Sequence, residues 1–210
     1  MSDARRKLLI ATGSRHKFAE LSELLDLPGF ELLSLADAGL TDDAAEDGQS
    51  FEENAVAKAL HYAARSGLPT LADDSGLEVH ALGGRPGVHT RRYAGPDATD
   101  DENNARLLAE LEDVAAFDRS ARYSCVLVLA EPDEGGGARV VETAHGTFEG
   151  RIARAPRGSG GFGYDPIFEP AIEPVGGRTV GEMSAAEKNA VSHRAQAARA
   201  IADLLRRRGQ

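Results

Sequence analysis

The stretch that decides how the chain begins to fold is Leu8-Leu9-Ile10-Ala11-Thr12-Gly13-Ser14. Its first four residues are a short apolar run with a β-branched residue, which is typical of a buried strand. Thr12-Gly13-Ser14 then indicates a turn. Apolar residues recur at helical spacing after it, at Phe18, Leu21, Leu24 and Leu25, until Pro28-Gly29. We therefore expect the chain to open as strand, loop and helix.

Similar patterns predict further strands and helices along the chain. We expect strands at 30–35, 70–72, 77–82, 122–130 and 139–148, and residues 133–137 connect the last two as a hairpin. Three capping-box spacings predict helix starts, at Ser50 with Glu53, at Thr99 with Glu102 and at Ser184 with Glu187. We expect these helices to end near residues 67, 111 and 207, respectively. Because strands and helices alternate early and a hairpin follows, we predict an α/β fold with a mixed β-sheet and flanking helices.

The length and charge of the chain limit the classes of protein to which it can belong. Its 210 residues suggest a single domain over residues 1–210, with two lobes as a possible arrangement. The 24 basic and 34 acidic side chains give a net charge of −10, which argues against a general nucleic-acid or membrane-surface binder. No apolar run approaches the ~20 residues of a membrane span, and the run at 8–11 is too short for a signal-peptide core. We expect no nucleic-acid partner, no membrane contact and a cytoplasmic location.

Cys125 is the only cysteine of the chain, so no internal disulfide can form and no cysteine-based metal site is available. It lies in an apolar run, residues 123–129. Because free cysteine behaves as a small apolar residue, we expect Cys125 to be a buried thiol.

The loop after the first expected strand is the first segment that could carry chemistry. A loop between a strand and a helix start presents unpaired N–H groups at the positive end of the helix dipole, which suits phosphate. Thr12 and Ser14 add hydroxyl groups, and Arg15 and Lys17 add positive charge. The segment does not match the Walker A pattern. An ordinary polar turn with a hydroxyl cap is the alternative.

Two adjacent carboxylates follow the expected strand at 70–72. Asp73 and Asp74 would lie at the carboxyl edge of the sheet, where ligands bind in open α/β sheets. Their oxygens would suit Mg²⁺, and one aspartate could instead orient or deprotonate a water. The alternative is an Asx-type turn closed by Gly76.

A glycine-dense stretch at 158–166 imitates a dinucleotide-binding fingerprint. Its glycines satisfy G-x-G-x-x-G, but that motif requires a helix to start there. Pro166, followed by Ile167-Phe168, favours a strand instead, so we reject the fingerprint. The stretch is then a flexible loop on which Phe162 or Tyr164 could stack on a base. Core aromatics at a glycine hinge are the alternative.

Basic residues gather in the sequence near the start of the last helical region. Lys188 and Ser192 are one turn apart on a helix, and His193-Arg194 follow directly. Such a group can hold phosphate oxygens or donate hydrogen bonds to a base carbonyl, while a solvated helix face is the alternative. Asn54 and Lys58 are likewise i, i+4 neighbours on the helix that starts at Ser50.

In this order and spacing, the segments resemble the inosine triphosphate pyrophosphatase family, the dITP/XTP pyrophosphatases. The resemblance runs from Lys7 to about Leu205, and its motifs lie at 11–20, 48–55, 72–77, 82–88, 160–168, 187–188 and 192–194. It implies a two-lobed mixed α/β fold with a central cleft, and a homodimer. It also implies Mg²⁺-dependent hydrolysis of purine nucleoside triphosphates to the monophosphate and pyrophosphate.

The resemblance also implies a role for each matching residue. Asp74 would be the catalytic carboxylate and a metal ligand, with Glu46 as the second ligand and Asp73 in support. The phosphates would be bound by Thr12, Gly13, Ser14, Arg15, His16 and Lys17, and Ser75 would contact the substrate. The nucleoside pocket would consist of Phe162, Gly163, Tyr164, Asp165, Lys188, His193 and Arg194. Many family members have asparagine at the position of Ser14.

The expected reaction begins with a water that Asp74 or a neighbouring carboxylate activates. The water attacks the α-phosphorus and expels pyrophosphate, while a metal and cations neutralise the phosphate oxygens. Donors from Lys188, His193 or Arg194 to O6 would accept hypoxanthine and xanthine and disfavour adenine.

ITP, dITP and XTP are therefore the leading substrates, and two other functions remain open. One is a pyrophosphatase that prefers modified pyrimidine triphosphates. The other is a nucleotide sensor that does not hydrolyse its ligand. The paired aspartates argue against the sensor, because carboxylates beside a polyanion need a metal between them.

Overall fold

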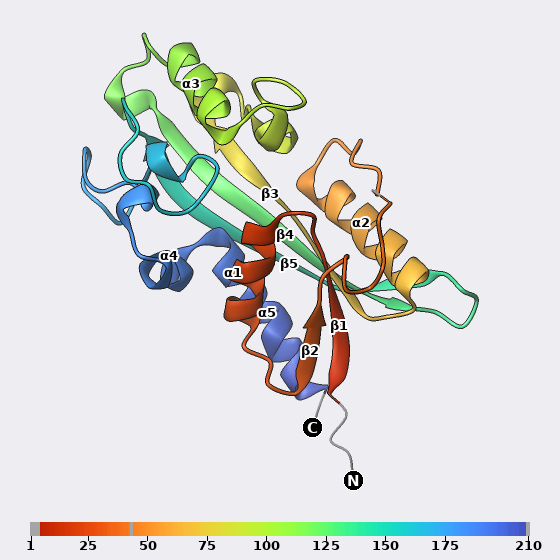
Figure 1. Cartoon of the computed structure of the whole chain (residues 1–210). Coiled ribbons are helices and arrows are strands. Elements are labelled where there is room, and N and C mark those ends of the chain that lie inside the picture. The colour runs from red at the N-terminus through yellow and green to blue at the C-terminus, as the bar shows by residue number, and fades with distance from the viewer. Residues whose placement is uncertain (1–4, 43, 209–210) are drawn as a thin grey trace. The chain divides into compact units, whose positions relative to one another are not determined.

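The structure is a computed structural model that describes residues 5–42 and 44–208 (Figure 1). Its strands and helices are β1 (Arg6–Ala11), α1 (Arg15–Leu25), β2 (Phe30–Leu33), α2 (Phe51–Ser66), β3 (Thr70–Val79), α3 (Asp100–Glu110), β4 (Ser120–Pro132), β5 (Ala138–Ile152), β6 (Phe168–Pro170), α4 (Ala185–Val191) and α5 (His193–Arg207). The described strands form one sheet in the order β2-β1-β3-β4-β5-β6. β1 is parallel to β2 and β3, whereas β5 and β6 are antiparallel. The predicted α/β fold with a mixed sheet and flanking helices is confirmed.

The chain divides into two compact units. Unit 1 consists of the residues up to Asp74, Cys125–Gly146 and the residues from Arg194 onward, and unit 2 consists of Ser75–Ser124 and Thr147–His193. The boundaries fall within β3, β4 and β5 and at the start of α5. The expectation of a single domain over the whole chain stays a prediction.

Unit 1 has helices on both faces of its part of the sheet. Leu8 and Ile10 of β1 belong to a buried cluster with α1 and α5, whereas Leu9 and Ala11 belong to another with α2. Successive strand residues point to opposite faces, so the unbroken apolar run of β1 fits a strand that is covered on both sides. Figure 1 shows α1 and α5 on one side of β1 and α2 on the other.

Unit 2 has its own apolar core. Leu107 of α3 packs there with Phe148 of β5 and Phe168 of β6, and all three are buried. No helix in the described parts of the chain is long and apolar enough to cross a membrane.

Capping residues start the helices as the sequence predicts, with one difference. Thr99 and Ser184 form complete capping boxes at α3 and α4. Ser50 accepts a hydrogen bond from the Glu53 N–H, but the Glu53 carboxylate accepts from the Gln49 N–H and not from that of Ser50. The capping box at the start of α2 is therefore incomplete, because only the hydrogen bond to the Ser50 side chain is made.

The structure differs from the sequence-based expectation in three elements. β3 is one continuous strand through Asp73 and Gly76, so the expected break at 73–76 and its alternative, an Asx-type turn, are both wrong. The last helical region is interrupted at Ser192, whose extended backbone separates α4 from α5. Residues 165–167 form a short 3₁₀ turn, and the strand that follows the glycine loop begins at Phe168.

Cys125 is the buried thiol that the sequence predicts, with 1% of its surface exposed. Burial raises the pKa of this thiol well above its ordinary value, and the nearby charge of Asp73 raises it further. We therefore predict that an aromatic disulfide reagent leaves the native protein unlabelled at about pH 8, because the reactive thiolate is scarce and covered. Absorbance of the released thiol measures the reaction, and one equivalent should react in guanidinium. Rapid labelling of the native protein would contradict this burial.

Candidate active site

The residues that the sequence predicts for the site fall into two sets, one in each unit. Unit 1 holds the residues expected to act on the phosphates and metal, which are 12–17, Glu46, Asp73 and Asp74, together with Arg194. Unit 2 holds the other residues expected to contact the nucleotide, which are Ser75, 162–165, Lys188 and His193. Two boundaries between the units separate consecutive residues of this group, Asp74 from Ser75 and His193 from Arg194.

The loop between β1 and α1 is a polar turn that ends in a hydroxyl cap, and its expected phosphate binding stays a prediction. Ser14 is the N-cap of α1 and accepts a hydrogen bond from the Lys17 N–H, and Thr12 Oγ1 accepts from the Ser14 N–H. A side chain added at Gly13 would meet no atom within 4 Å, so the loop is open on that side. Among the contacts of the described residues, both hydroxyl groups act as acceptors, which leaves each O–H able to donate to a ligand. Arg15 and His16 are exposed in the first turn of α1.

Asp73 is the buried centre of a charged network in unit 1. Only 1% of its surface is exposed, and Lys17 of α1 pairs with its Oδ1. Arg194 Nε of α5 lies 3.0 Å from its Oδ2, and the Cys125 thiol donates to the same oxygen at 3.3 Å. Arg194 also pairs with Glu20. Burial opposes the charge on Asp73, but Arg194 and Lys17 hold the pKa of Asp73 well below its usual range. Asp73 is thus a fixed anion that holds Lys17.

Asp74 has different partners, which come from α2. Asn54 Nδ2 lies 3.2 Å from Asp74 Oδ2, and Lys58 Nζ lies 3.0 Å from Asp74 Oδ1. Burial raises the pKa of Asp74 above its ordinary value, and the Lys58 ammonium only partly offsets this. Asp74 is therefore a stronger base than a solvated aspartate, as a group that takes a proton from water should be. The sequence identified Asn54 and Lys58 as neighbours on one helix but assigned them no role.

The pleat of β3 explains why adjacent aspartates differ in this way. Successive side chains of a strand point to opposite faces of the sheet. Leu71 belongs to the cluster with α1 and α5, and Ala72 to the cluster with α2. Asp73 therefore shares the face of Leu71, and Asp74 shares that of Ala72. Pairing between β1 and β3 ends at Ala72, so both aspartates follow the last residue of β3 that pairs with β1.

Glu46 and Asp74 offer oxygen ligands that suit Mg²⁺. Burial would lower the pKa of the Lys58 ammonium, but Asp74 and then Glu46 raise it above its ordinary value. Glu46 Oε1 lies 2.9 Å from Lys58 Nζ, so both carboxylates already surround one positive charge. Mg²⁺ is commonly bound through one or two carboxylates and substrate phosphates. Within residues 5–42 and 44–208, no three His, Cys, Asp or Glu side chains gather closely enough to hold a metal, so phosphate and water would supply the remaining ligands.

The segment that carries Glu46 is anchored to α2 by contacts that the sequence analysis missed. The Asp42 carboxylate lies 2.9 Å from His61 Nε2 and 3.3 Å from Arg65 Nη2. The Tyr62 hydroxyl donates to the Asp42 carbonyl and accepts from the Ala44 N–H. The signal in the sequence was the i, i+4 spacing of His61 and Arg65, which places both basic groups on one helix face opposite an acidic loop.

In unit 2, Asp165 holds together the residues expected to form the nucleoside pocket. It is buried, and its Oδ2 accepts hydrogen bonds from the Phe162 N–H at 2.9 Å and from Lys188 Nζ at 2.7 Å. The Lys188 ammonium also lies 4.6 Å from the centre of the Phe162 ring, within the range of a cation–π contact. One carboxylate thus fixes both the aromatic loop and the lysine.

Helix α3 clamps the same loop at Gly163. Asp100 Oδ2 accepts from the Gly163 N–H at 2.6 Å, and Asn104 Nδ2 donates to its carbonyl at 3.0 Å. Gly163 has a φ of +64°, a conformation that favours glycine. Sequence reasoning missed Asp100 and Asn104, although they are i, i+4 neighbours on a predicted helix.

The two aromatics of the glycine loop occupy different environments. Tyr164 is buried, and its hydroxyl donates to the Thr90 carbonyl at 2.8 Å. Phe162 is only partly buried, so it is the better placed of the two to stack on a base. A core aromatic at a glycine hinge, the alternative that the sequence left open, describes Tyr164.

His193 and Arg194 are consecutive but have separate surroundings. His193 stacks on the Tyr123 ring, with centroids 4.8 Å apart and planes 8° from parallel. Arg194 pairs with Asp73 and Glu20 in unit 1. Its expected contact with the base therefore stays a prediction. Ser75 is buried in β3, and its contact with substrate also stays a prediction.

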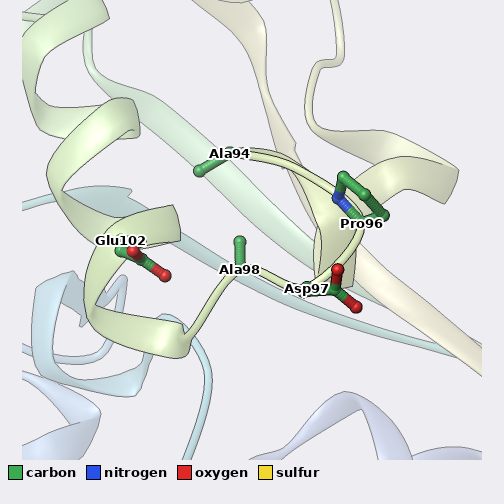
Figure 2. Close-up of a pocket in the computed structure, with 5 residues that line it drawn as sticks. All are labelled: Ala94, Pro96, Asp97, Ala98 and Glu102. Atoms are coloured by element: carbon green, nitrogen blue, oxygen red, sulfur yellow. The ribbon is translucent and has the colours of Figure 1, made fainter.

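A separate hollow in unit 2 contains none of the expected site residues (Figure 2). It encloses about 420 Å³ and is lined by Ala94, Pro96, Asp97, Ala98 and Glu102. The Glu102 carboxylate is engaged in the cap of α3. We therefore do not include this hollow in the candidate site.

Comparison with known proteins identifies the family. The model of the Ham1 family matches residues 8–204. The dITP/XTP pyrophosphatase of Methylococcus capsulatus is 49% identical over 202 residues, which cover 96% of this chain and 97% of that protein. The dITP/XTP pyrophosphatase of Escherichia coli strain K12 is 45% identical over 201 residues, which cover 96% of this chain and 98% of that protein.

Solved structures give the same relationship. A HAM1 protein from Coxiella burnetii has a TM-score of 0.83 and 42% identity, and the match covers 96% of this chain and 99% of that one. A structure from Mycobacterium abscessus, described as a nucleoside-triphosphatase / dITP/XTP pyrophosphatase, has a TM-score of 0.71 and 43% identity, with 95% and 98% covered. The protein is thus an enzyme, a hydrolase of the pyrophosphatase class. It belongs to the Ham1 family.

The opposite pKa shifts of the two aspartates predict different effects on stability. Asp73→Asn should lower the free energy of unfolding at about pH 7 by about 3–5 kcal/mol, because it removes one partner of a buried ion pair. Asp74→Asn should leave this free energy unchanged or raise it, because burial disfavours the charged form of Asp74. Urea unfolding followed by circular dichroism measures both values. Equal destabilisation by the two substitutions would contradict the assignment.

The same difference predicts how each contribution depends on pH. Asp73 has a lowered pKa, so its contribution to stability is present above its ordinary value of 3.8 and is lost as the pH falls towards the folded value. Asp74 has a raised pKa, so its contribution is present below 3.8 and is lost as the pH rises through the folded value. The penalty for Asp73→Asn should therefore shrink in acid. A penalty that grew as the pH fell would be inconsistent with this sign.

Proposed function

We propose that the protein hydrolyses deaminated purine nucleoside triphosphates, namely ITP, dITP and XTP, to the monophosphate and pyrophosphate. The observation that carries this proposal is the pair Asp73 and Asp74, of which one is a fixed anion that holds a lysine and the other is a buried base. The names of the relatives support the substrate class, since they describe dITP/XTP pyrophosphatases. The cytoplasmic location, which rests on the sequence pattern, and the homodimer, which the family resemblance implies, stay predictions.

The triphosphate is bound by the segment from Thr12 to Lys17. The N-terminus of α1 and the hydroxyls of Thr12 and Ser14 donate to phosphate oxygens. Lys17 adds positive charge, and Asp73 fixes its direction. Asp73 is then a positioning residue for the phosphate-binding lysine, and Arg194 keeps Asp73 ionised.

Mg²⁺ is the proposed cofactor, and Glu46 and Asp74 are its proposed ligands. When bound, the ion would neutralise phosphate oxygens and increase the electrophilicity of the phosphorus. Lys58 keeps the two carboxylates close together through their shared contacts. The Asp42 contacts with α2 hold the segment from which Glu46 projects.

Asp74 accepts a proton from the water that attacks the α-phosphorus. The bond from the α-phosphorus to its bridging oxygen breaks, and pyrophosphate leaves with the electron pair. The raised pKa of Asp74 makes this proton transfer more favourable than for a solvated aspartate. Asn54 and Lys58 orient the carboxylate for that step.

Base selection comes from the second set of residues. Phe162 stacks on the purine, and Lys188 and His193 donate hydrogen bonds towards O6. Adenine carries an amino donor at this position, so its complex would leave donors facing each other and unpaired. Hypoxanthine and xanthine carry an acceptor there.

The reaction is tested with dITP and Mg²⁺ in oxygen-18 water, with product analysis by mass spectrometry. We expect deoxyinosine monophosphate and pyrophosphate, with the heavy oxygen in the monophosphate because water attacks the α-phosphorus. Deoxyinosine diphosphate with orthophosphate, or binding without turnover, would overturn the proposed activity. Label in the pyrophosphate would overturn only the site of attack.

A substrate panel tests the specificity. We expect kcat/KM for dITP to exceed that for dATP by at least about 100-fold, because donors facing an amino group stay unpaired. Modified pyrimidine triphosphates belong in the same panel. A preference for one of them would replace the purine assignment.

Replacing Asp74 by asparagine tests its role in the reaction. Asp74→Asn should lower kcat for dITP by at least about 100-fold, as loss of a general base does. Asp97→Asn, which removes an exposed carboxylate outside the candidate site, is the matched control and should keep the wild-type rate. A wild-type rate in Asp74→Asn would exclude Asp74 as the base.

The metal assignment requires a separate measurement. Glu46→Gln should raise the Mg²⁺ concentration needed for half-maximal rate by about tenfold or more, because a carboxylate ligand is lost. Excess chelator should abolish wild-type turnover and added Mg²⁺ should restore it. An unchanged Mg²⁺ requirement in Glu46→Gln would remove Glu46 from the ligand set.

A further inference from the structure

Tyr123 of β4 is a buried tyrosine that contacts two of the expected nucleoside-pocket residues in unit 2. Its hydroxyl donates to Asp165 Oδ1 at 3.2 Å. Its ring stacks on His193, with centroids 4.8 Å apart. In the sequence Tyr123 is part of an apolar strand pattern, and no step of the proposed reaction uses it.

The hydroxyl contact adds a donor to those that Asp165 already receives. The other carboxylate oxygen, Oδ2, accepts from the Phe162 N–H and from Lys188 Nζ. Loss of the Tyr123 hydroxyl would remove a donor to Oδ1 in a buried place, where an unmade hydrogen bond is costly. The carboxylate would then be held less firmly, and so would the lysine and the loop that it contacts.

The ring contact acts on a different group. The imidazole of His193 and the phenol ring of Tyr123 are 8° from parallel, so the stack fixes the plane of the imidazole. Tyr123 is itself held by the core, where the centroid of its ring lies 4.7 Å from that of the Phe168 ring. The position of His193 therefore depends on a side chain that the core holds firmly.

The chemistry of this position requires tyrosine and not only an aromatic ring. Burial and the charge of Asp165 raise the pKa of the Tyr123 phenol well above its ordinary value, so the hydroxyl stays protonated and donates. Phenylalanine would fill the same space and keep the stack, but it could not hold Asp165. Leucine would keep an apolar core and remove both contacts.

We propose that Tyr123 is a positioning residue for base recognition, which fixes Asp165 through its hydroxyl and His193 through its ring. The inference rests on the proposed function, because it assigns these two groups to the recognition of the purine. Through Asp165, one tyrosine sets the positions of Lys188 and Phe162 as well. Tyr123 itself does not contact substrate.

The test compares Tyr123→Phe, Tyr123→Leu and Tyr93→Phe by steady-state kinetics with dITP and dATP. Tyr93→Phe is the matched control, because Tyr93 lies in the same core and its hydroxyl also donates to a carboxylate, that of Glu110 at 2.6 Å. We expect Tyr123→Phe to raise KM for dITP about tenfold and to change kcat less than about twofold. Tyr123→Leu should reduce the ratio of kcat/KM for dITP to that for dATP more than Tyr123→Phe does, because it removes both contacts. Tyr93→Phe should match the wild type.

Proton NMR of the His193 ring gives a readout that does not require activity. The ring protons lie over an aromatic face and are shielded, so they should move downfield in Tyr123→Leu and stay in place in Tyr123→Phe. An unchanged His193 spectrum in Tyr123→Leu would overturn the stacking part of the proposal.

The kinetic outcomes separate this proposal from the proposed function. A wild-type enzyme that does not hydrolyse dITP would overturn the proposed function, and the base-recognition role of Tyr123 with it. A wild-type enzyme that is active, with Tyr123→Phe indistinguishable from Tyr93→Phe, would overturn the Tyr123 proposal alone. An equal loss of kcat for all substrates at unchanged KM would assign Tyr123 to the stability of the core and also overturn it.

Discussion

The buried carboxylate of Asp73 is the constraint on which the rest of unit 1 depends. An isolated charge in this position would cost several kcal/mol, so it needs cations at fixed places. Lys17 comes from the first helix and Arg194 from the last, 56 and 121 residues away along the chain. The charge therefore ties β3 to α1 and α5. The same contacts hold Lys17 next to the loop at 12–14, so one ion-pair network would serve both stability and the proposed binding of the triphosphate.

A single strand, β3, carries both aspartates and gives them different surroundings. Asp73 and Asp74 are adjacent, and the pleat of β3 directs them to opposite faces of the sheet. One face carries α1 and α5, which supply the cations of Asp73, and the other carries α2, which supplies Asn54 and Lys58 to Asp74. The fold thereby lowers the pKa of one aspartate and raises that of its neighbour. In the proposed mechanism this difference separates a positioning group from a base.

Local sequence patterns predicted the elements well, and long-range contacts explain where they did not. The apolar run of β1 and the helix caps at Thr99 and Ser184 depend on neighbours in the sequence, and the structure has them as expected. β3 continues through the expected break at 73–76, and the charge of Asp73 within the strand is neutralised by distant partners, Lys17 and Arg194. Arg194 was grouped with His193 because they are consecutive, yet consecutive residues on a helix point about 100° apart. The sequence therefore predicted the candidate residues as a set. It did not predict their division between two units or the contacts of Tyr123 with Asp165 and His193.

The central claim is that the fold shifts the pKa values of the two aspartates in opposite directions. Carbon-13 NMR of the aspartate carboxyl carbons measures this directly, as a titration over the pH range in which the protein stays folded. The account predicts that the Asp73 signal does not titrate near its ordinary pKa of 3.8, whereas the Asp74 signal titrates with a midpoint above 3.8. Two midpoints at the ordinary value, or a reversed order of the two, would contradict it.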